Sequence, residues 1–274
     1  MKPIFKWAGG KRKLLPSIKE VIDFELLQGN TLYEPFVGGG ALFLDLENDK
    51  VHINDLNSEL INAYIQIKEN PKKLIKLLRK YSINNSKEFY YKMRNYDRQK
   101  SFSRLSNITK AARTIYLNRT CYNGLYRVNS QGKFNVPCGY YKKPDIILEE
   151  KIISLSEYLN RVSATITNLD FEEAVKDAKE NDLVYFDPPY DYEKEGFTSY
   201  TSNGFSREDL RRLKRVCDEL IERGCKVIIS NNDTPFVNEL FNDPKYIIKH
   251  VVTRWMISCD GKNRKEIKEV IIYG

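Results

Sequence analysis

Leu183-Val184-Tyr185-Phe186-Asp187-Pro188-Pro189-Tyr190 is the stretch that decides the fold class of this chain. Its four leading apolar residues predict a short buried strand. The two prolines end that strand abruptly, because proline cannot donate a hydrogen bond to a ladder. We therefore expect Asp187 at the carboxyl end of a strand, which is the edge where open α/β sheets bind their ligands.

The tetrad Asp187-Pro188-Pro189-Tyr190 carries groups that suit an amine attached to a nucleic-acid base. Such an amine is a poor nucleophile, because its lone pair is delocalised into the ring. The Asp187 carboxylate and the Pro188 carbonyl can each accept one amino hydrogen, and Pro189 stiffens the backbone that holds this carbonyl. Tyr190 offers a flat face on which an extruded base can stack. The same four residues also fit a strand end with a tight turn and a packed tyrosine.

The composition suits one large α/β domain or a domain with an insertion, since the chain has 274 residues, of which 41% are hydrophobic. Five cysteines without a CxxC pair and only two histidines predict no metal site. We find neither an apolar run of membrane-spanning length nor a signal-peptide pattern, so we expect a cytoplasmic protein with no membrane partner.

The positive charge is concentrated in the middle of the chain. The net charge is +8, and residues 56–150 hold 19 Lys/Arg against 7 Asp/Glu. A basic segment inside a mildly acidic frame is typical of a module that binds a polyanion. A solvated, lysine-rich helical surface would have the same composition.

A glycine turn near the amino end predicts a nucleoside-binding cradle. Residues 31–34 read as a strand, Gly38-Gly39-Gly40 as the turn, and a helix follows from Ala41. A second short strand over 51–54 ends at Asp55, whose carboxylate can accept both hydroxyls of a ribose. These features leave both a dinucleotide and S-adenosylmethionine open as the ligand.

Residues 57–150 predict a helical insert that interrupts the βα alternation. Its last part, 119–144, contains Asn123-Gly124 and Gln131-Gly132, which predict the turns of a β-hairpin. Aromatic, amide and cationic side chains interleave there as they do on base-reading surfaces. A hairpin without a binding role would carry similar residues. We therefore divide the chain into a catalytic, cofactor-binding domain (1–56 and 151–274) and a recognition insert (57–150).

Seven short motifs follow one another over nearly the whole chain. They are Lys6-Trp7-Ala8-Gly9-Gly10-Lys11, Glu34-Pro35-Phe36-Val37-Gly38-Gly39-Gly40, Asn54-Asp55, Tyr122-Asn123-Gly124-Leu125-Tyr126-Arg127, Phe134-Asn135-Val136-Pro137, Asp170-Phe171 and Asp187-Pro188-Pro189-Tyr190. Together they resemble the Dam family of DNA adenine-N6 methyltransferases. The resemblance implies a Rossmann-like methyltransferase domain of the α/β class, with an inserted, mainly helical DNA-recognition domain that carries a β-hairpin.

The resemblance also implies the reaction and its site. Methyl would pass from S-adenosylmethionine to the adenine amino group of a base flipped out of duplex DNA within GATC, without a metal, and the protein would be a monomer in solution, with more than one copy possible on DNA. The implied catalytic residues are Asp187, Pro188, Pro189 and Tyr190. The implied cofactor residues are Trp7, Lys11, Phe36, Gly38, Gly40, Asp55, Asp170, Phe171 and Asp187. The implied sequence readers are Lys6, Leu125, Arg127, Pro137 and Tyr141, and Tyr122 and Asn123 would intrude beside the flipped base.

Three other readings compete with this one. The same chemistry could serve RNA adenine or a protein glutamine amide, but glutamine methylation usually goes with Asn at the first tetrad position, where this chain has Asp187. A catalytically silent DNA-binding protein would not need the intact tetrad. One position departs from the family pattern: Tyr140 stands where many members have an arginine, which removes one expected phosphate contact.

Overall fold

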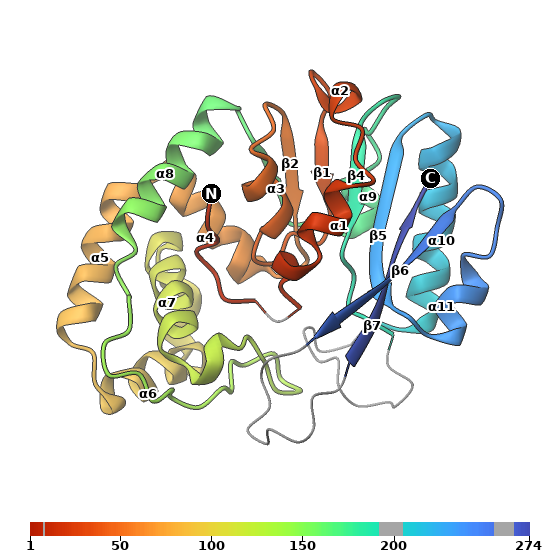
Figure 1. Cartoon of the computed structure of the whole chain (residues 1–274). Coiled ribbons are helices and arrows are strands. Elements are labelled where there is room, and N and C mark those ends of the chain that lie inside the picture. Colours follow the sequence, from red (N-terminus) through yellow and green to blue (C-terminus); the bar gives the residue numbers. More distant parts are fainter. Residues whose placement is uncertain (8, 192–204, 255–265) are drawn as a thin grey trace.

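A single mostly parallel sheet organises the molecule. The computed structural model describes residues 1–7, 9–191, 205–254 and 266–274 (Figure 1). Seven strands in that part of the chain form one sheet in the order β3-β2-β1-β4-β5-β7-β6. Strands β1 to β5 run parallel, and β7 is antiparallel to its neighbours β5 and β6. The strands are β1 (Leu32–Glu34), β2 (Val51–Asn54), β3 (Thr165–Thr167), β4 (Leu183–Phe186), β5 (Lys226–Asn232), β6 (Ile247–Arg254) and β7 (Glu266–Tyr273). The predicted α/β, Rossmann-like fold is confirmed.

Helices lie on both sides of the sheet, with α5, α6 and α7 gathered on one side of the molecule and α10 and α11 on the other (Figure 1). The α-helices are α1 (Leu15–Lys19), α2 (Phe24–Leu27), α3 (Ala41–Leu46), α4 (Ser58–Glu69), α5 (Pro71–Ile83), α6 (Lys87–Asn95), α7 (Asn107–Thr120), α8 (Glu149–Arg161), α9 (Phe171–Ala174), α10 (Arg207–Glu222) and α11 (Pro235–Leu240). Short 3-10 helices are η1 (Lys11–Lys13), η2 (Tyr96–Arg98), η3 (Lys100–Arg104) and η4 (Tyr122–Gly124). Over the described ranges we find no helix with the length and apolar character to cross a bilayer.

The alternation of side chains along the strands builds two separate hydrophobic cores. Successive residues of a strand point to opposite faces of the sheet. In β4, Leu183 and Tyr185 join the core that faces α3, α4 and α8. Val184 and Phe186 join the core that packs against α10. All four residues of β4 are buried, as expected for a central strand that is covered on both faces.

The strand order predicts a ligand-binding crevice between β1 and β4. The chain proceeds from β1 outward to β2 and β3 on one side, and from β4 to β5 on the other. The two directions of winding therefore meet between β1 and β4, where doubly wound sheets bind ligands at the carboxyl ends of the strands. The glycine turn follows β1 and the tetrad follows β4, so both motifs flank this crevice.

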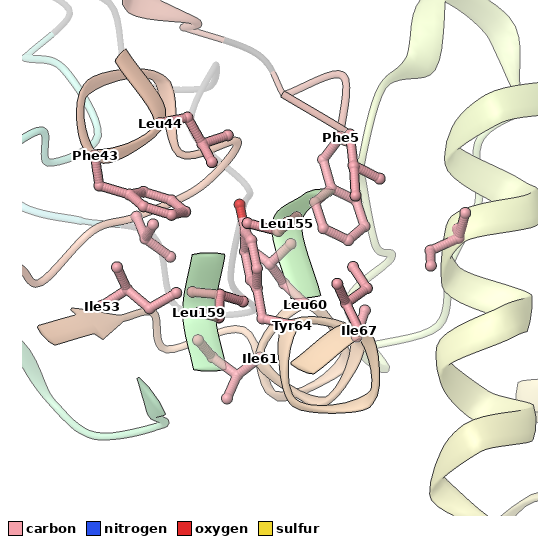
Figure 2. Close-up of a cluster of buried hydrophobic side chains, with 14 of the residues drawn as sticks. Phe5, Phe43, Leu44, Ile53, Leu60, Ile61, Tyr64, Ile67, Leu155 and Leu159 are labelled. Atoms are coloured by element: carbon pink, nitrogen blue, oxygen red, sulfur yellow. The ribbon is translucent and has the colours of Figure 1, made fainter. Parts of the chain in front are cut away.

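A continuous hydrophobic cluster runs across the predicted boundary at residues 56 and 57. Figure 2 shows Phe43 of α3 and Ile53 of β2 packed with Tyr64 of α4 and with Leu155 and Leu159 of α8. The rings of Phe43 and Tyr64 meet edge to face, with their centroids 6.2 Å apart. Helix α4 thus packs on the sheet domain as well as on α7 and α5. The division of the chain into a catalytic domain and an insert stays a prediction.

The segment 119–144, called the reader segment below, has less strand-to-strand pairing than its two predicted turns led us to expect. Two isolated antiparallel bridges join Cys121 to Cys138 and Val128 to Phe134. Many of its backbone groups bond to side chains instead of to a facing strand. The Phe134 amide donates to Asp97 Oδ2 at 2.9 Å, and the Val136 carbonyl accepts from the Tyr90 hydroxyl at 2.9 Å. The hairpin is therefore held by the helices beneath it.

Candidate active site

The tetrad meets the amino-terminal lysine at the carboxyl end of β4. Lys11 Nζ lies 2.8 Å from Asp187 Oδ1 and donates to the Gly9 carbonyl at 2.5 Å. The same nitrogen lies 4.2 Å from the centroid of the Tyr190 ring, which is a cation–π contact. Two residues predicted for the cofactor and the chemistry are thus in direct contact, although about 175 positions separate them in the chain.

Burial sets the proton affinity of the tetrad carboxylate. The Asp187 side chain is only 21% exposed, and its burial raises its pKa to about 6, although the Lys11 ammonium lowers it. A pKa of about 6 leaves Asp187 mostly ionised at neutral pH. The carboxylate can therefore accept an amine hydrogen at pH 7 without the strong preference for water that an exposed carboxylate has.

The chain beyond the tetrad is anchored by a group of polar residues on β5 and its neighbours. The Asp191 amide donates to Asn231 Oδ1 at 3.0 Å, and Asn232 Nδ2 donates to the Asp191 carbonyl at 3.0 Å. The Asp191 carboxylate accepts two bonds from Arg207, at 3.0 and 3.1 Å, and one from Thr234 at 2.8 Å. Both the backbone and the side chain of Asp191 are fixed, so the backbone directly after Tyr190 has little freedom to move.

The glycine turn after β1 needs glycine at two positions. Gly38 has φ +46°, and a Cβ there would lie 2.8 Å from Cδ1 of Trp7. Gly40 has φ +71°, and a Cβ there would lie 2.1 Å from the ring of Phe43. Both positive φ and lack of space exclude other residues. The turn is also held by the Tyr64 hydroxyl, which donates to the Gly38 carbonyl at 3.0 Å.

Asp55 lies beside this turn, at the end of β2. Its Oδ2 accepts the Gly38 amide at 3.0 Å and its Oδ1 accepts the Asn57 amide at 2.9 Å. Burial raises the pKa of Asp55 to about 6, against these two hydrogen bonds, which lower it. The sequence predicted a carboxylate facing ribose hydroxyls, which stays a prediction; the structure shows Asp55 bracing the glycine turn.

The side chain of Asn54 connects the ends of β1, β2 and β3. In the sequence this residue was singled out only as part of the motif Asn54-Asp55. Its side-chain amide donates to the carbonyls of Pro35 and Leu169, each at 3.0 Å. Its Oδ1 accepts the Leu169 amide at 2.8 Å and the Thr167 hydroxyl at 2.9 Å. One buried side chain therefore aligns the ends of β1, β2 and β3 at the crevice.

A group of three aromatic rings connects Phe36, just before the glycine turn, with Phe171 of α9. The rings of Phe36 and Phe171 stack with centroids 5.4 Å apart, and Phe205 lies 5.7 Å from Phe36 and 6.1 Å from Phe171. Asp170 caps α9, and its Oδ2 accepts from Arg212 at 2.9 Å. Of the predicted pair, Phe171 thus contacts the predicted Phe36 beside the glycine turn, and Asp170 is bonded to Arg212.

The amino-terminal segment joins the glycine turn to the reader segment. Asn118 accepts the Lys6 amide at 2.9 Å and donates to the carbonyls of Lys6 at 2.7 Å and Gly124 at 3.1 Å. The next residue, Trp7, stacks on Tyr126 with ring centroids 5.2 Å apart. Residues expected to bind the cofactor therefore contact the segment expected to read DNA. Nothing in the local pattern around Asn118 predicted this role.

The predicted readers are mostly exposed. Tyr122 is 44% exposed, Leu125 and Tyr141 are exposed too, and Asn123 adopts a left-handed backbone with φ +52°. Lys6 Nζ donates to the Tyr141 hydroxyl at 3.2 Å and lies 4.4 Å from the centre of its ring. These side chains form a cationic and aromatic surface on the reader segment.

Arg127 is held from within the reader segment, and Pro137 is held both from within it and by Tyr90 of α6. Arg127 Nε donates to Asn135 Oδ1 at 2.8 Å, and we find no other hydrogen-bond or ion-pair partner for this arginine among the described residues. Its terminal guanidinium nitrogens are therefore open to a ligand. The Pro137 carbonyl accepts the Tyr122 amide at 2.9 Å, so Pro137 also supports the residue expected beside the flipped base.

A buried ion pair supports the reader segment from below, and the sequence did not predict it. Arg113 is 1% exposed, and its Nη2 lies 2.9 Å from Asp97 Oδ2. The same oxygen accepts the Phe134 amide, and Arg98 donates to the Phe134 carbonyl at 2.7 Å. Breaking a buried pair of this kind leaves an unpaired charge and is strongly destabilising.

Across the described residues, no group of three or more His, Cys, Asp or Glu is arranged to hold a metal ion. The titratable residues near the tetrad instead form an ion pair and a cation–π contact.

Comparison with known proteins gives one family. Residues 7–257 match the family model described as D12 class N6 adenine-specific DNA methyltransferase. The chain is 45% identical to a type II methyltransferase of Lactococcus lactis subsp. cremoris, with 99% of this chain and 95% of the relative covered. It is 39% identical to a type II methyltransferase of Methanocaldococcus jannaschii, with 99% and 98% covered. It is 35% identical to the DNA adenine methylase of Escherichia coli K12, with 97% and 92% covered. These matches confirm the predicted family and enzyme class: the chain belongs to the D12 class of N6 adenine-specific DNA methyltransferases.

Proposed function

We propose that this adenine-specific DNA methyltransferase uses S-adenosylmethionine to methylate adenine within GATC, after flipping the base out of the duplex. The observation that carries the proposal is the meeting of Lys11, Asp187 and Tyr190 beside the glycine turn. It puts a carboxylate, a flat ring and a cofactor-type cradle at one crevice. In this proposal the protein is a cytoplasmic monomer in solution, and more than one copy can bind to DNA.

The residues around the glycine turn fit S-adenosylmethionine. Gly38 and Gly40 let the backbone turn sharply after β1, because Trp7 and Phe43 pack where a Cβ would stand. We assign Asp55 to the ribose hydroxyls, Phe36 and Phe171 to the adenine ring, and Trp7 and Lys11 to the amino-acid portion. When bound, S-adenosylmethionine supplies an electrophilic methyl group on its sulfonium centre.

The tetrad residues prepare the adenine amine. Asp187 and the Pro188 carbonyl each accept one amino hydrogen, which favours a more tetrahedral nitrogen with its lone pair free to react. Pro189 restricts the backbone at Pro188 and so fixes the direction of this carbonyl. Tyr190 stacks on the base face, and this requires a base outside the helix, since the target atom cannot be reached inside a duplex.

The reader segment supplies the sequence preference. Arg127 keeps its terminal nitrogens for the O6 and N7 atoms of a guanine, which is the commonest specific contact in the major groove. Lys6, Leu125, Pro137 and Tyr141 complete the reading surface. Tyr122 and Asn123 enter the space that the flipped adenine leaves. The names of the relatives support DNA as the partner, and the excess of Lys and Arg in residues 56–150 supports contact with its backbone.

The test is transfer of labelled methyl from S-adenosylmethionine to matched duplexes. One duplex contains GATC, others carry single-base changes in it, and one has no such site. We expect label only in the GATC duplex, recovered as N6-methyladenine. Label in a different sequence would contradict the proposed target and the reader residues. Transfer to RNA of the same sequence, with none to DNA, would contradict DNA as the substrate of this chain.

A further inference from the structure

Glu269 contacts the tetrad from the last strand, and no motif of the sequence includes it. It lies on β7, opposite Asn232 of β5 and Val251 of β6. Glu269 is 8% exposed, and its Oε1 accepts the Tyr190 hydroxyl at 2.9 Å. An antiparallel strand thus brings a second carboxylate to the tetrad that follows the parallel strand β4.

The Tyr190 ring is held at three places. Lys11 Nζ lies over its face at 4.2 Å from the centroid, and Glu269 accepts its hydroxyl. The chain on its carboxyl side is fixed at Asp191 by Asn231. Because the Asp191 anchor acts on the backbone, Glu269 is the contact that fixes the far end of the ring. Loss of this contact would let the ring turn away from a stacked base.

Glu269 also acts on the tetrad through its charge. Coulombic repulsion from Glu269 raises the pKa of Asp187, in addition to the larger effect of burial, and it also raises the pKa of the Tyr190 hydroxyl. Among the described residues, the titratable groups that face Asp187 are Lys11 of η1, Glu34 of β1, Tyr185 of β4, Tyr190 and Glu269 of β7. Of these, Lys11 is the cation and Glu269 is a carboxylate bonded to the tetrad.

We propose that Glu269 is a positioning residue for methyl transfer: its carboxylate holds the Tyr190 ring for stacking and places a second negative charge next to Asp187. This inference rests on the roles proposed above for Asp187 and Tyr190. It adds a residue that acts through the tetrad, by its bond to the Tyr190 hydroxyl.

The charge is tested with Glu269→Gln, which keeps the size of the side chain and an oxygen that can accept the Tyr190 hydroxyl. Without the negative charge, Asp187 loses its proton more readily. We therefore expect the acid limb of the plot of kcat/KM against pH to move to lower pH, while kcat at pH 8 stays within about threefold of the wild type. Thermal unfolding of each variant shows that the compared proteins are folded.

The hydrogen bond is tested with Glu269→Ala and Tyr190→Phe. Each removes one partner, and we expect each to lower kcat by about tenfold while KM for S-adenosylmethionine is unchanged. The double variant should lose no more than either single variant, because both changes remove the same contact.

Two results together would overturn the proposal: multiplicative losses in the double variant, and an unmoved acid limb in Glu269→Gln. They would show that Glu269 supports only the packing of β7. The wild-type profile is measured with whichever duplex the protein methylates. A target other than GATC would therefore contradict the proposed target sequence, while the test of Glu269 stays in force.

Discussion

The tetrad lies at the carboxyl ends of the parallel strands, a region called the sheet edge below. This region and the reader segment are built in opposite ways. At the sheet edge, Asp55 and Asp187 are carboxylates whose pKa is raised by burial. In the reader segment, Tyr122 and Leu125 are exposed, and Arg127 has one hydrogen-bond partner among the described residues. The two regions are joined by Trp7, which touches both the glycine turn and Tyr126.

The difference follows from what each region has to do. Preparing an amine for methylation needs a carboxylate of fixed direction and tuned proton affinity, and both come from burial and from partners such as Lys11. Reading bases needs donors and acceptors that are still free when DNA arrives. A chemical change at the sheet edge should therefore affect rate, and a change in the reader segment should affect sequence preference.

The largest expected effect would test the sheet-edge half of this contrast. Asp187→Ala removes the acceptor for the amine hydrogen and should lower the rate of methyl transfer by roughly 10²–10⁴-fold. DNA binding, followed by fluorescence anisotropy, should persist because the reader segment is untouched. Asp187→Asn is the matched control for size, since it keeps an oxygen but not the charge. Equal loss of DNA binding and methylation would contradict the role given to Asp187.

Arg127→Ala tests the reader half. It should relax discrimination at one guanine of the target by about 1–3 kcal/mol, while kcat on saturating target DNA changes little. The measurement compares kcat/KM for GATC and for duplexes with each base changed in turn. Asn135→Ala removes the bond that orients Arg127 and should have a smaller effect of the same kind. Unchanged preference in Arg127→Ala would remove this arginine from the readers.

The burial of Glu34 at the sheet edge can be tested by measuring how the free energy of unfolding depends on pH. Burial raises its pKa from 4.5 to about 8, so between these values the folded state holds one proton more than the unfolded state. The free energy of unfolding should therefore fall as pH rises, by roughly 1–2 kcal/mol from pH 6 to pH 7.5. Urea unfolding at several pH values measures this slope. In Glu34→Gln, which can still accept the Phe43 amide, the slope should become clearly shallower. The part that stays comes from groups such as Asp55 and Asp187, whose pKa is also raised by burial. An unchanged slope would show that Glu34 does not cause it.

The smallest expected effect concerns Tyr140, which is 96% exposed on the reader segment. Tyr140→Arg adds the cation that the resemblance to the Dam family implies at this position. It should tighten DNA binding a few-fold at low salt and steepen the plot of log K against log salt by about one unit. The gain should be the same for GATC and for unrelated duplexes. A gain confined to GATC would make position 140 a sequence reader.

Much of the sheet edge could be predicted because its signals are local. The prolines after Phe186 end β4, and the glycines after Glu34 start a turn between strand and helix, so the places of Asp187 and Gly38 follow from neighbouring residues. The order of motifs along the chain then identified the family. The roles of the individual site residues remain predictions until they are measured.

Contacts between distant elements could not be predicted. Glu269 faces Tyr190 only because β7 inserts between β5 and β6, and nothing in its local sequence indicates that order. The buried pair of Arg113 and Asp97 is of the same kind, since each residue alone reads as a solvated charge on a helix. The two turns of the reader segment predicted a hairpin, but its backbone bonds to Asp97 and Tyr90 left only isolated bridges.

The position of β7 has a consequence for how the enzyme folds while it is synthesised on the ribosome. β7 lies between β5 and β6 in space but follows both in the chain. A growing polypeptide therefore passes through a stage in which the tetrad, β5 and β6 have been synthesised while Tyr190 has no carboxylate to bind. During that stage β6 cannot join the sheet, because the strand that lies between β5 and β6 has not yet been synthesised. The nascent chain should thus acquire a complete sheet and a fixed Tyr190 in one late step, when residues 266–273 leave the exit tunnel.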